Sequence, residues 1–265
     1  MLNWKNLTWM HLFILLLILH LAPLWIFTYF PSQDGPSHLY NALMRKEYHQ
    51  HQNYKIRDVW ELNITIFPNW LSHITLALLL CVFPAILSEK ILLSLLVELV
   101  PISFFYFLHA VYKRGFLFGW LAFLFSYNYL LFMGFYNFTL SISFFFFSFC
   151  FWWKHRQDIQ VNHLIVLYLL LLLTYLSHIA SYGLLLLAIS VTALCLWISE
   201  SIHQVWLDRK TSGVTHMLSR FLLGLKPLVQ FALYMLPAYF VFDGLLSAEP
   251  ERPLNWESSR HGVDR

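Results

Sequence analysis

The chain has 265 residues, of which 59% are hydrophobic, 19% are aromatic and only 12% are charged. A soluble domain carries about 25% charged residues, so this chain has too few charged side chains to cover a soluble surface of its size. The net charge of +3 is too small to indicate nucleic acid as a partner. The composition therefore excludes a soluble globular domain. It predicts an all-α, polytopic bundle of transmembrane helices.

The first apolar run covers residues 9–29 and follows a single lysine, Lys5. It is longer than the core of a signal peptide, and no cleavage site of small residues follows it. We therefore expect an uncleaved first span. Further apolar runs of suitable length for candidate spans occupy 70–87, 91–111, 116–132, 136–153, 163–179, 182–199 and 221–242.

The positions of Lys and Arg decide which of these runs cross the membrane, because basic residues gather on the cytoplasmic side. If all eight runs crossed, with the N-terminus inside, two basic clusters would lie outside. If the run 70–87 instead lies along the outer face, three basic clusters become cytoplasmic, at 113–114, 154–156 and 209–210. The charges therefore predict about seven spans.

This topology predicts a long first external loop at about 30–90, which contains juxtamembrane helices. The uncharged turns at 133–137 and 177–182 face the same side. Residues 1–246 then form one transmembrane module, and residues 247–265 form a polar external tail. A loop as long as the first one usually has a function, so we expect the site there.

Within this loop, Asp34-Gly35-Pro36 predicts the start of a helix that runs to about His51, because Pro suits the first turn and Asp or Gly suits the cap. Asp34 and His38 are four residues apart and therefore close together. Two interpretations are open. Asp34 caps the helix beside a surface histidine, or it is a general base with an imidazole beside it for a proton or a phosphate.

One span is followed by an Asp-containing motif that opens a helix, by the stretch Pro68–Leu78, and by Lys90 at the start of the next span. This order of features resembles the GT-C superfamily of membrane glycosyltransferases, including its protein mannosyltransferase and aminoarabinose transferase branches. In that family the segment placed like 68–87 is a juxtamembrane helix. The chain is expected to be an N-terminal portion of a longer member or a divergent short form.

The resemblance implies that a sugar moves from a polyprenyl-phosphate donor to an acceptor at the external face of a bacterial cytoplasmic membrane. Asp34 matches the catalytic acidic residue of the family's first loop. Many members carry a second acidic residue there and another in the second external loop, whereas this chain has Gly35, Tyr136 and Asn137. A divalent metal is therefore unsupported, and no other cofactor is expected. The expected partners are the lipid-linked sugar donor and membrane lipids.

We expect Asp34 and His38 to be catalytic. The residues expected to bind substrate are polar side chains near the external face: Asn69, His73, Lys90, Asn137 and His178. Headgroup contact or interfacial solvation explains most of them equally well. The alternative functions are a transporter or flippase, which ionisable residues in mid-membrane would favour, and a non-catalytic scaffold in which Asp34 is only a cap.

Overall fold

The computed structural model describes residues 4–48, 50–59, 68–112, 115–158 and 160–208. The expected span 221–242, the tail 247–265 and the basic pairs 113–114 and 209–210 lie outside the described residues. Met1–Cys195 forms one compact unit, and the site lies in it. Of the second unit, Leu196–Arg265, the structure describes residues 196–208, which are the last turns of a helix.

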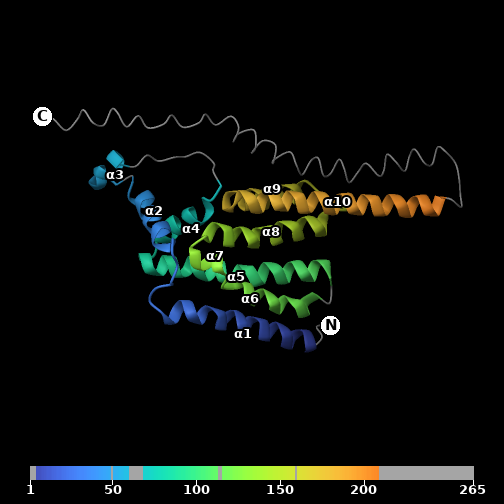
Figure 1. Ribbon diagram of the computed structural model, residues 1–265, viewed down its shortest axis with the longest axis horizontal. Helices are drawn as coiled ribbons and strands as arrows, with labels where there is room; N and C mark the ends of the chain where they lie inside the picture. Colours follow the sequence, from blue (N-terminus) through green and yellow to red (C-terminus); the bar gives the residue numbers. More distant parts are fainter. Residues whose placement is uncertain (1–3, 49, 60–67, 113–114, 159, 209–265) are drawn as a thin grey trace. The chain divides into compact units, whose positions relative to one another are not determined.

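The described residues form helices joined by short connections, and no strand occurs among them, which confirms the predicted all-helical class. Figure 1 shows their arrangement. In chain order the helices are α1 (Trp4–Ile26), α2 (Gly35–Glu47), η1 (His51–Asn53), α3 (Tyr54–Val59), α4 (Leu71–Leu80), α5 (Ala85–Val111), η2 (Gly115–Ala122), α6 (Phe123–Ser126), α7 (Tyr129–Met133), α8 (Tyr136–His155), α9 (Val161–Ser177) and α10 (Ile179–Asp208).

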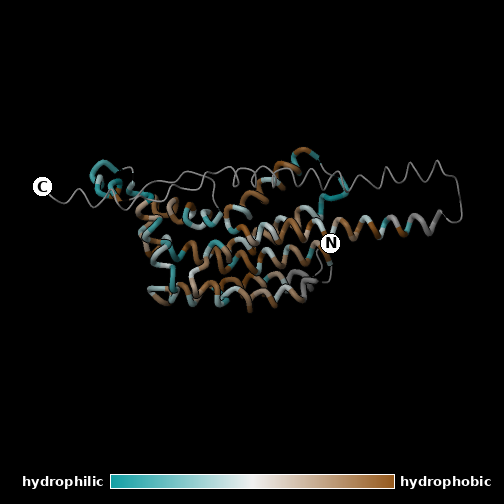
Figure 2. The backbone as a smooth tube through the Cα atoms, turned by 45° about the horizontal axis from the view of Figure 1, so that its top comes forward, coloured by the Kyte–Doolittle hydropathy of each residue, from teal (hydrophilic) through white to brown (hydrophobic). Residues whose placement is uncertain are grey.

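Three of these helices contain segments that are long and apolar enough to cross a membrane, namely Trp9–Ile26, Ala85–Val111 and Ile179–Glu200. The 27 residues of α5 rise about 40 Å, more than the roughly 30 Å of a hydrocarbon core. In Figure 2 the long helices are mostly white and brown, whereas α2 and α3 are largely teal. The helices indicate a membrane protein, and the seven-span arrangement stays a prediction.

Helix α4 is much shorter than the apolar run 70–87 that contains it. Its ten residues rise about 15 Å, half of a hydrocarbon core, so α4 does not cross a membrane by itself. Lys46 of α2 donates a hydrogen bond from Nζ to the carbonyl oxygen of Leu80 at 2.6 Å, which satisfies a carbonyl at the end of α4. After a four-residue connection, α5 begins at Ala85.

The apolar pattern predicts one continuous helix at 116–132. The structure instead divides this run among η2, α6 and α7. The helix stops at Tyr127, and Asn128 takes an extended backbone conformation. The Asn128 side chain accepts a hydrogen bond from the Leu131 amide at 3.0 Å and so starts α7 as an N-cap. A polar cap thus interrupts an apolar run whose composition alone favours an unbroken helix.

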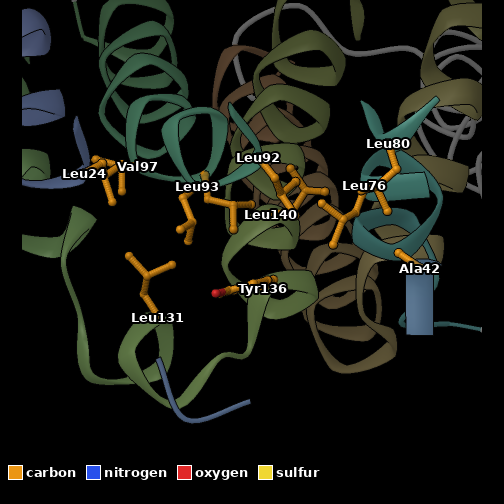
Figure 3. Packing of buried hydrophobic residues seen from close by; sticks show 11 residues of the cluster. Leu24, Ala42, Leu76, Leu80, Leu92, Leu93, Val97, Leu131, Tyr136 and Leu140 are labelled. Carbon is orange, nitrogen blue, oxygen red and sulfur yellow. The ribbon is translucent and has the colours of Figure 1, made fainter. Parts of the chain in front are cut away.

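Helix α5 forms the centre of the hydrophobic core. Its buried side chains recur at the spacing of one helical face, Leu92, Leu93, Leu96 and Val97. Figure 3 shows leucines of α1, α4, α7 and α8 packed around them. The ends of α4, α7 and α8 are therefore held against α5, and the candidate site lies where these ends meet.

Candidate functional site

The loop before α2 is paired with the turn between α7 and α8. The Gln33 amide donates to the Phe132 carbonyl oxygen at 2.9 Å, and the Asp34 amide donates to that of Met133 at 3.3 Å. Gly134 then ends α7 with a φ of 89°, a left-handed conformation that favours glycine. These bonds place Asp34 directly against Gly134, although 100 residues separate the two in sequence.

Asp34 occupies the N-cap position of α2, yet its side chain makes no capping hydrogen bond with the described chain. The Ser32 hydroxyl oxygen accepts the hydrogen bond of the Gly35 amide instead, at 2.8 Å. The Asp34 backbone carbonyl accepts the His38 amide at 3.1 Å, as in any first helical turn. The interpretation of Asp34 as a side-chain cap is therefore wrong, and its carboxylate is free for another role.

A cavity of about 490 Å³ opens beside this carboxylate. Six of the seven residues that the sequence predicts for the site line it, and Lys90 does not. The full lining is Asp34, His38, Asn69, His73, Leu130, Phe135, Tyr136, Asn137, Phe138 and His178. The loop before α2, the start of α4, the turn before α8 and the turn after α9 therefore meet at one place.

His38 and His73 form a hydrogen-bonded pair in the cavity wall. His38 Nε2 lies 2.7 Å from the Gly134 carbonyl oxygen, which only accepts, so Nε2 carries the proton. In the neutral ring Nδ1 is then an acceptor, and the Nε2–H of His73 donates to it at 3.3 Å. This assignment leaves a lone pair on His73 Nδ1, which is buried and has no hydrogen-bond partner among the described residues.

Both imidazoles are held neutral. Burial lowers the pKa of His38, while the Gly134 carbonyl and the Asp34 charge oppose that effect. Burial, and after it the charges of His38 and Arg45, lowers the pKa of His73 to about 4. At neutral pH the cavity therefore presents an acidic side chain beside two uncharged imidazoles.

Asn137 lines the cavity, but the chain itself uses both ends of its amide. Oδ1 accepts the Ser72 amide at 2.8 Å, and Nδ2 donates to the Asn69 carbonyl oxygen at 2.7 Å. Asn137 thus caps the first turn of α4 from another helix. Asn69 has a φ of 65°, which turns the chain into α4, and its side chain is exposed at the cavity edge.

His178 is the single residue between α9 and α10. Its ring stands edge-on to Phe138 with 5.1 Å between the centroids, and burial lowers its pKa. Its Nδ1 atom is buried without a hydrogen-bond partner in the described residues. No group of three or more His, Cys, Asp or Glu side chains in the described part of the chain is arranged to hold a metal ion.

Lys90, which was expected to bind substrate, does not line the cavity. Its Nζ atom lies over the ring of Trp25 in α1, 5.7 Å from the centroid. One turn further along α5, Ser94 accepts a hydrogen bond from Trp25 Nε1 at 3.1 Å, so this face of α5 packs on α1. Because consecutive helical residues differ by about 100° in direction, Glu89 can face the cavity end while Lys90 cannot.

Arg45, which the sequence does not single out, lies beside the cavity without lining it. Its guanidinium carbon lies 4.2 Å from the centroid of the Trp70 ring, and its charge reaches His73. Arg45 follows His38 by seven residues, so both lie on one face of α2. That spacing is the signal by which Arg45 could have been found. Tyr136, which also lines the cavity, is likewise not among the predicted residues.

The chain matches no protein-family model, no curated protein and no solved structure.

Proposed function

We propose that the chain is a membrane glycosyltransferase that moves a sugar from a polyprenyl-phosphate donor to an acceptor hydroxyl, with Asp34 as the general base. The observation that carries the proposal is the Asp34 carboxylate itself. It is released from helix capping by Ser32 and lines a cavity with the His38–His73 pair. A general base needs this access to the proton that it removes.

In the reaction, the acceptor oxygen forms a bond to the anomeric carbon of the sugar, and the bond from that carbon to the phosphate oxygen breaks. The acceptor proton goes to Asp34, and the phosphate leaves with the bonding electrons. A cation stabilises the charge that develops on the phosphate. We assign this role to Arg45, whose guanidinium is stacked on Trp70 and whose charge reaches His73 in the cavity wall, whereas Lys90 faces α1.

In this proposal the cavity opens on the external face of a bacterial cytoplasmic membrane, and the N-terminus is cytoplasmic. Two observations support the arrangement. Helix α4, with ten residues, is too short to cross a hydrocarbon core by itself, which is consistent with the seven-span topology. Asp34 and the two uncharged turns line one cavity, whereas Lys154 and Arg156 lie at the other end of α8, about 30 Å away for a helix of 20 residues.

The test is the replacement Asp34→Asn in membranes supplied with a lipid-linked sugar donor. Asparagine keeps the shape of the side chain but does not accept a proton, so sugar transfer should fall at least about 100-fold. Asp58→Asn is the matched control, because Asp58 is exposed on α3. Normal transfer by the Asp34→Asn variant would remove Asp34 from the mechanism.

One observation favours the transporter alternative. Glu98 lies in the middle of α5, and its Oε1 atom is buried without a hydrogen-bond partner in the described residues. An ionisable residue within a span often marks a pathway for an ion or substrate. The same assay separates the two functions. A transferase should transfer sugar, lose that activity through Asp34→Asn and keep it through Glu98→Gln. A transporter should transfer no sugar in this assay, and Glu98→Gln should instead reduce the movement of its substrate across the membrane.

A further inference from the structure

Tyr136 is the most completely buried polar side chain of the cavity wall. The residue is 0% exposed, and its ring lies 5.0 Å from that of His38 between centroids. Its hydroxyl oxygen lies 2.9 Å from the Ser32 hydroxyl and 3.3 Å from Glu89 Oε1. Tyr136 is the first residue of α8. Its phenol therefore connects the loop before α2, through Ser32, with α5, through Glu89.

The protons of this cluster fit only one direction. The Tyr136 hydroxyl donates its proton to Glu89, because an ionised carboxylate only accepts. Ser32 Oγ accepts the Gly35 amide, and its own proton then points to the Tyr136 oxygen. The chain of hydrogen bonds thus runs from the backbone of the loop through two hydroxyls to the carboxylate, and each hydroxyl donates once.

The loop also packs directly on the cluster. Gly35 follows Asp34 and has no room for a side chain, because a β-carbon there would lie 2.5 Å from the Tyr136 hydroxyl and 2.9 Å from Glu89 Oε1. On its other side the loop is bonded to the carbonyls of Phe132 and Met133. Asp34 is therefore held between two attachments, and the Tyr136 cluster is one of them.

We propose that Tyr136, supported by Glu89, is a positioning residue that fixes the Asp34 loop and so aims the Asp34 carboxylate into the cavity. This inference rests on the proposed function for its effect on catalysis. The attachment of the loop is a property of the fold and is measurable without any substrate.

The first test compares kinetic constants for sugar transfer. Tyr136→Phe keeps the ring against His38 and removes the hydroxyl, so kcat should fall by about 10-fold to 100-fold, the effect of a small misplacement, with KM for the donor little changed. Glu89→Gln keeps an oxygen that accepts the Tyr136 proton and should retain most of the activity, whereas Glu89→Leu should resemble Tyr136→Phe. Tyr129→Phe, which removes an exposed hydroxyl outside the cluster, is the control.

The second test is hydrogen–deuterium exchange of the backbone amides in residues 32–38 of the full chain in detergent. Tyr136→Phe should exchange these amides at least about 10-fold faster than the wild type, since opening of the loop becomes easier, and Tyr129→Phe should not. Unchanged exchange overturns the inference whatever the activity. Faster exchange with normal kcat, while Asp34→Asn is inactive, also overturns the positioning role. If Asp34→Asn transfers sugar normally, the proposed function fails, and the exchange data still decide whether Tyr136 holds the loop.

Discussion

Gly134 combines two constraints that only glycine meets. Its φ of 89° lies in the left-handed region, and an added β-carbon would lie 2.8 Å from both the β-carbon and the amide nitrogen of Asp34. Gly134→Ala should therefore destabilise the protein by at least about 1–2 kcal/mol, the cost of a left-handed conformation for a residue with a β-carbon. The variant should also reduce sugar transfer, because relief of the contact displaces Asp34. Thermal unfolding in detergent and the transfer assay measure the two effects.

Gly183→Ala is the matched control. A β-carbon at Gly183 would have no neighbour within 4 Å, and the residue lies in α10, where alanine favours the helix. Its Tm and activity should equal or exceed those of the wild type. A Gly134→Ala variant as stable and active as Gly183→Ala would show that the approach of Asp34 to the turn does not position the carboxylate.

The sequence predicts a cavity residue correctly where the spacing of neighbouring residues in one helix places it there. Asp34 and His38 lie one turn apart at a helix start, and the structure places both in the cavity wall. Lys90 does not line the cavity, because the packing of α5 on Trp25 sets the direction of its side chain, and its position before a span does not show that direction. Arg45 was missed because the residues that it acts on, Trp70 and His73, lie outside α2.

Asn137 determines how α4 begins. It bonds the buried Ser72 amide and the Asn69 carbonyl, so Asn137→Ala leaves a buried donor and an acceptor unpaired. Loss of one buried partner costs about 1–3 kcal/mol, and we expect a decrease in stability in the upper part of that range. The start of α4 should also loosen, which moves His73 relative to His38. Thermal unfolding measures the first effect, and hydrogen–deuterium exchange of residues 70–74 measures the second.

Asn128→Ala is the comparison, since Asn128 caps α7 within its own loop. Removal of such a local cap costs about 1 kcal/mol. Equal losses of stability in the two variants would contradict the view that Asn137 acts as a cap between helices. Asn137 itself was expected to bind substrate as a polar side chain near the external face, and nothing in the sequence pairs it with residues 69–72.

The apolar pattern also predicts wrong bounds for some helices. In a chain this hydrophobic, composition does not show where a helix stops, so the run 116–132 reads as one helix although Asn128 divides it. The charges favour a non-crossing segment at 70–87, which the apolar pattern does not, because the positive-inside rule depends on side preference and not on local helix length. The length of α4 agrees with that prediction.

At the scale of the whole molecule, the cavity joins residues from four distant parts of the sequence, at Asp34, His73, Asn137 and His178. Periodicity does not predict such a meeting. It was nevertheless expected from topology, since seven spans place the loop and both uncharged turns on one side. The helix ends that meet at the cavity are therefore consistent with the sequence-based topology. The side of the membrane that these ends face depends on how the chain is inserted.

Cysteine labelling tests that side directly. In a variant without Cys81, Cys150 and Cys195, single cysteines are introduced by Gln33→Cys beside the cavity and by Gln157→Cys after α8, both at exposed positions. The 20 residues of α8 rise about 30 Å, the thickness of a hydrocarbon core, so the two positions should lie on opposite sides of the membrane. A membrane-impermeant maleimide should label Gln33→Cys in intact cells and Gln157→Cys only after permeabilisation. Labelling of both in intact cells would show that α8 does not cross, and the reverse pattern would place the Asp34 carboxylate in the cytoplasm, away from an external donor.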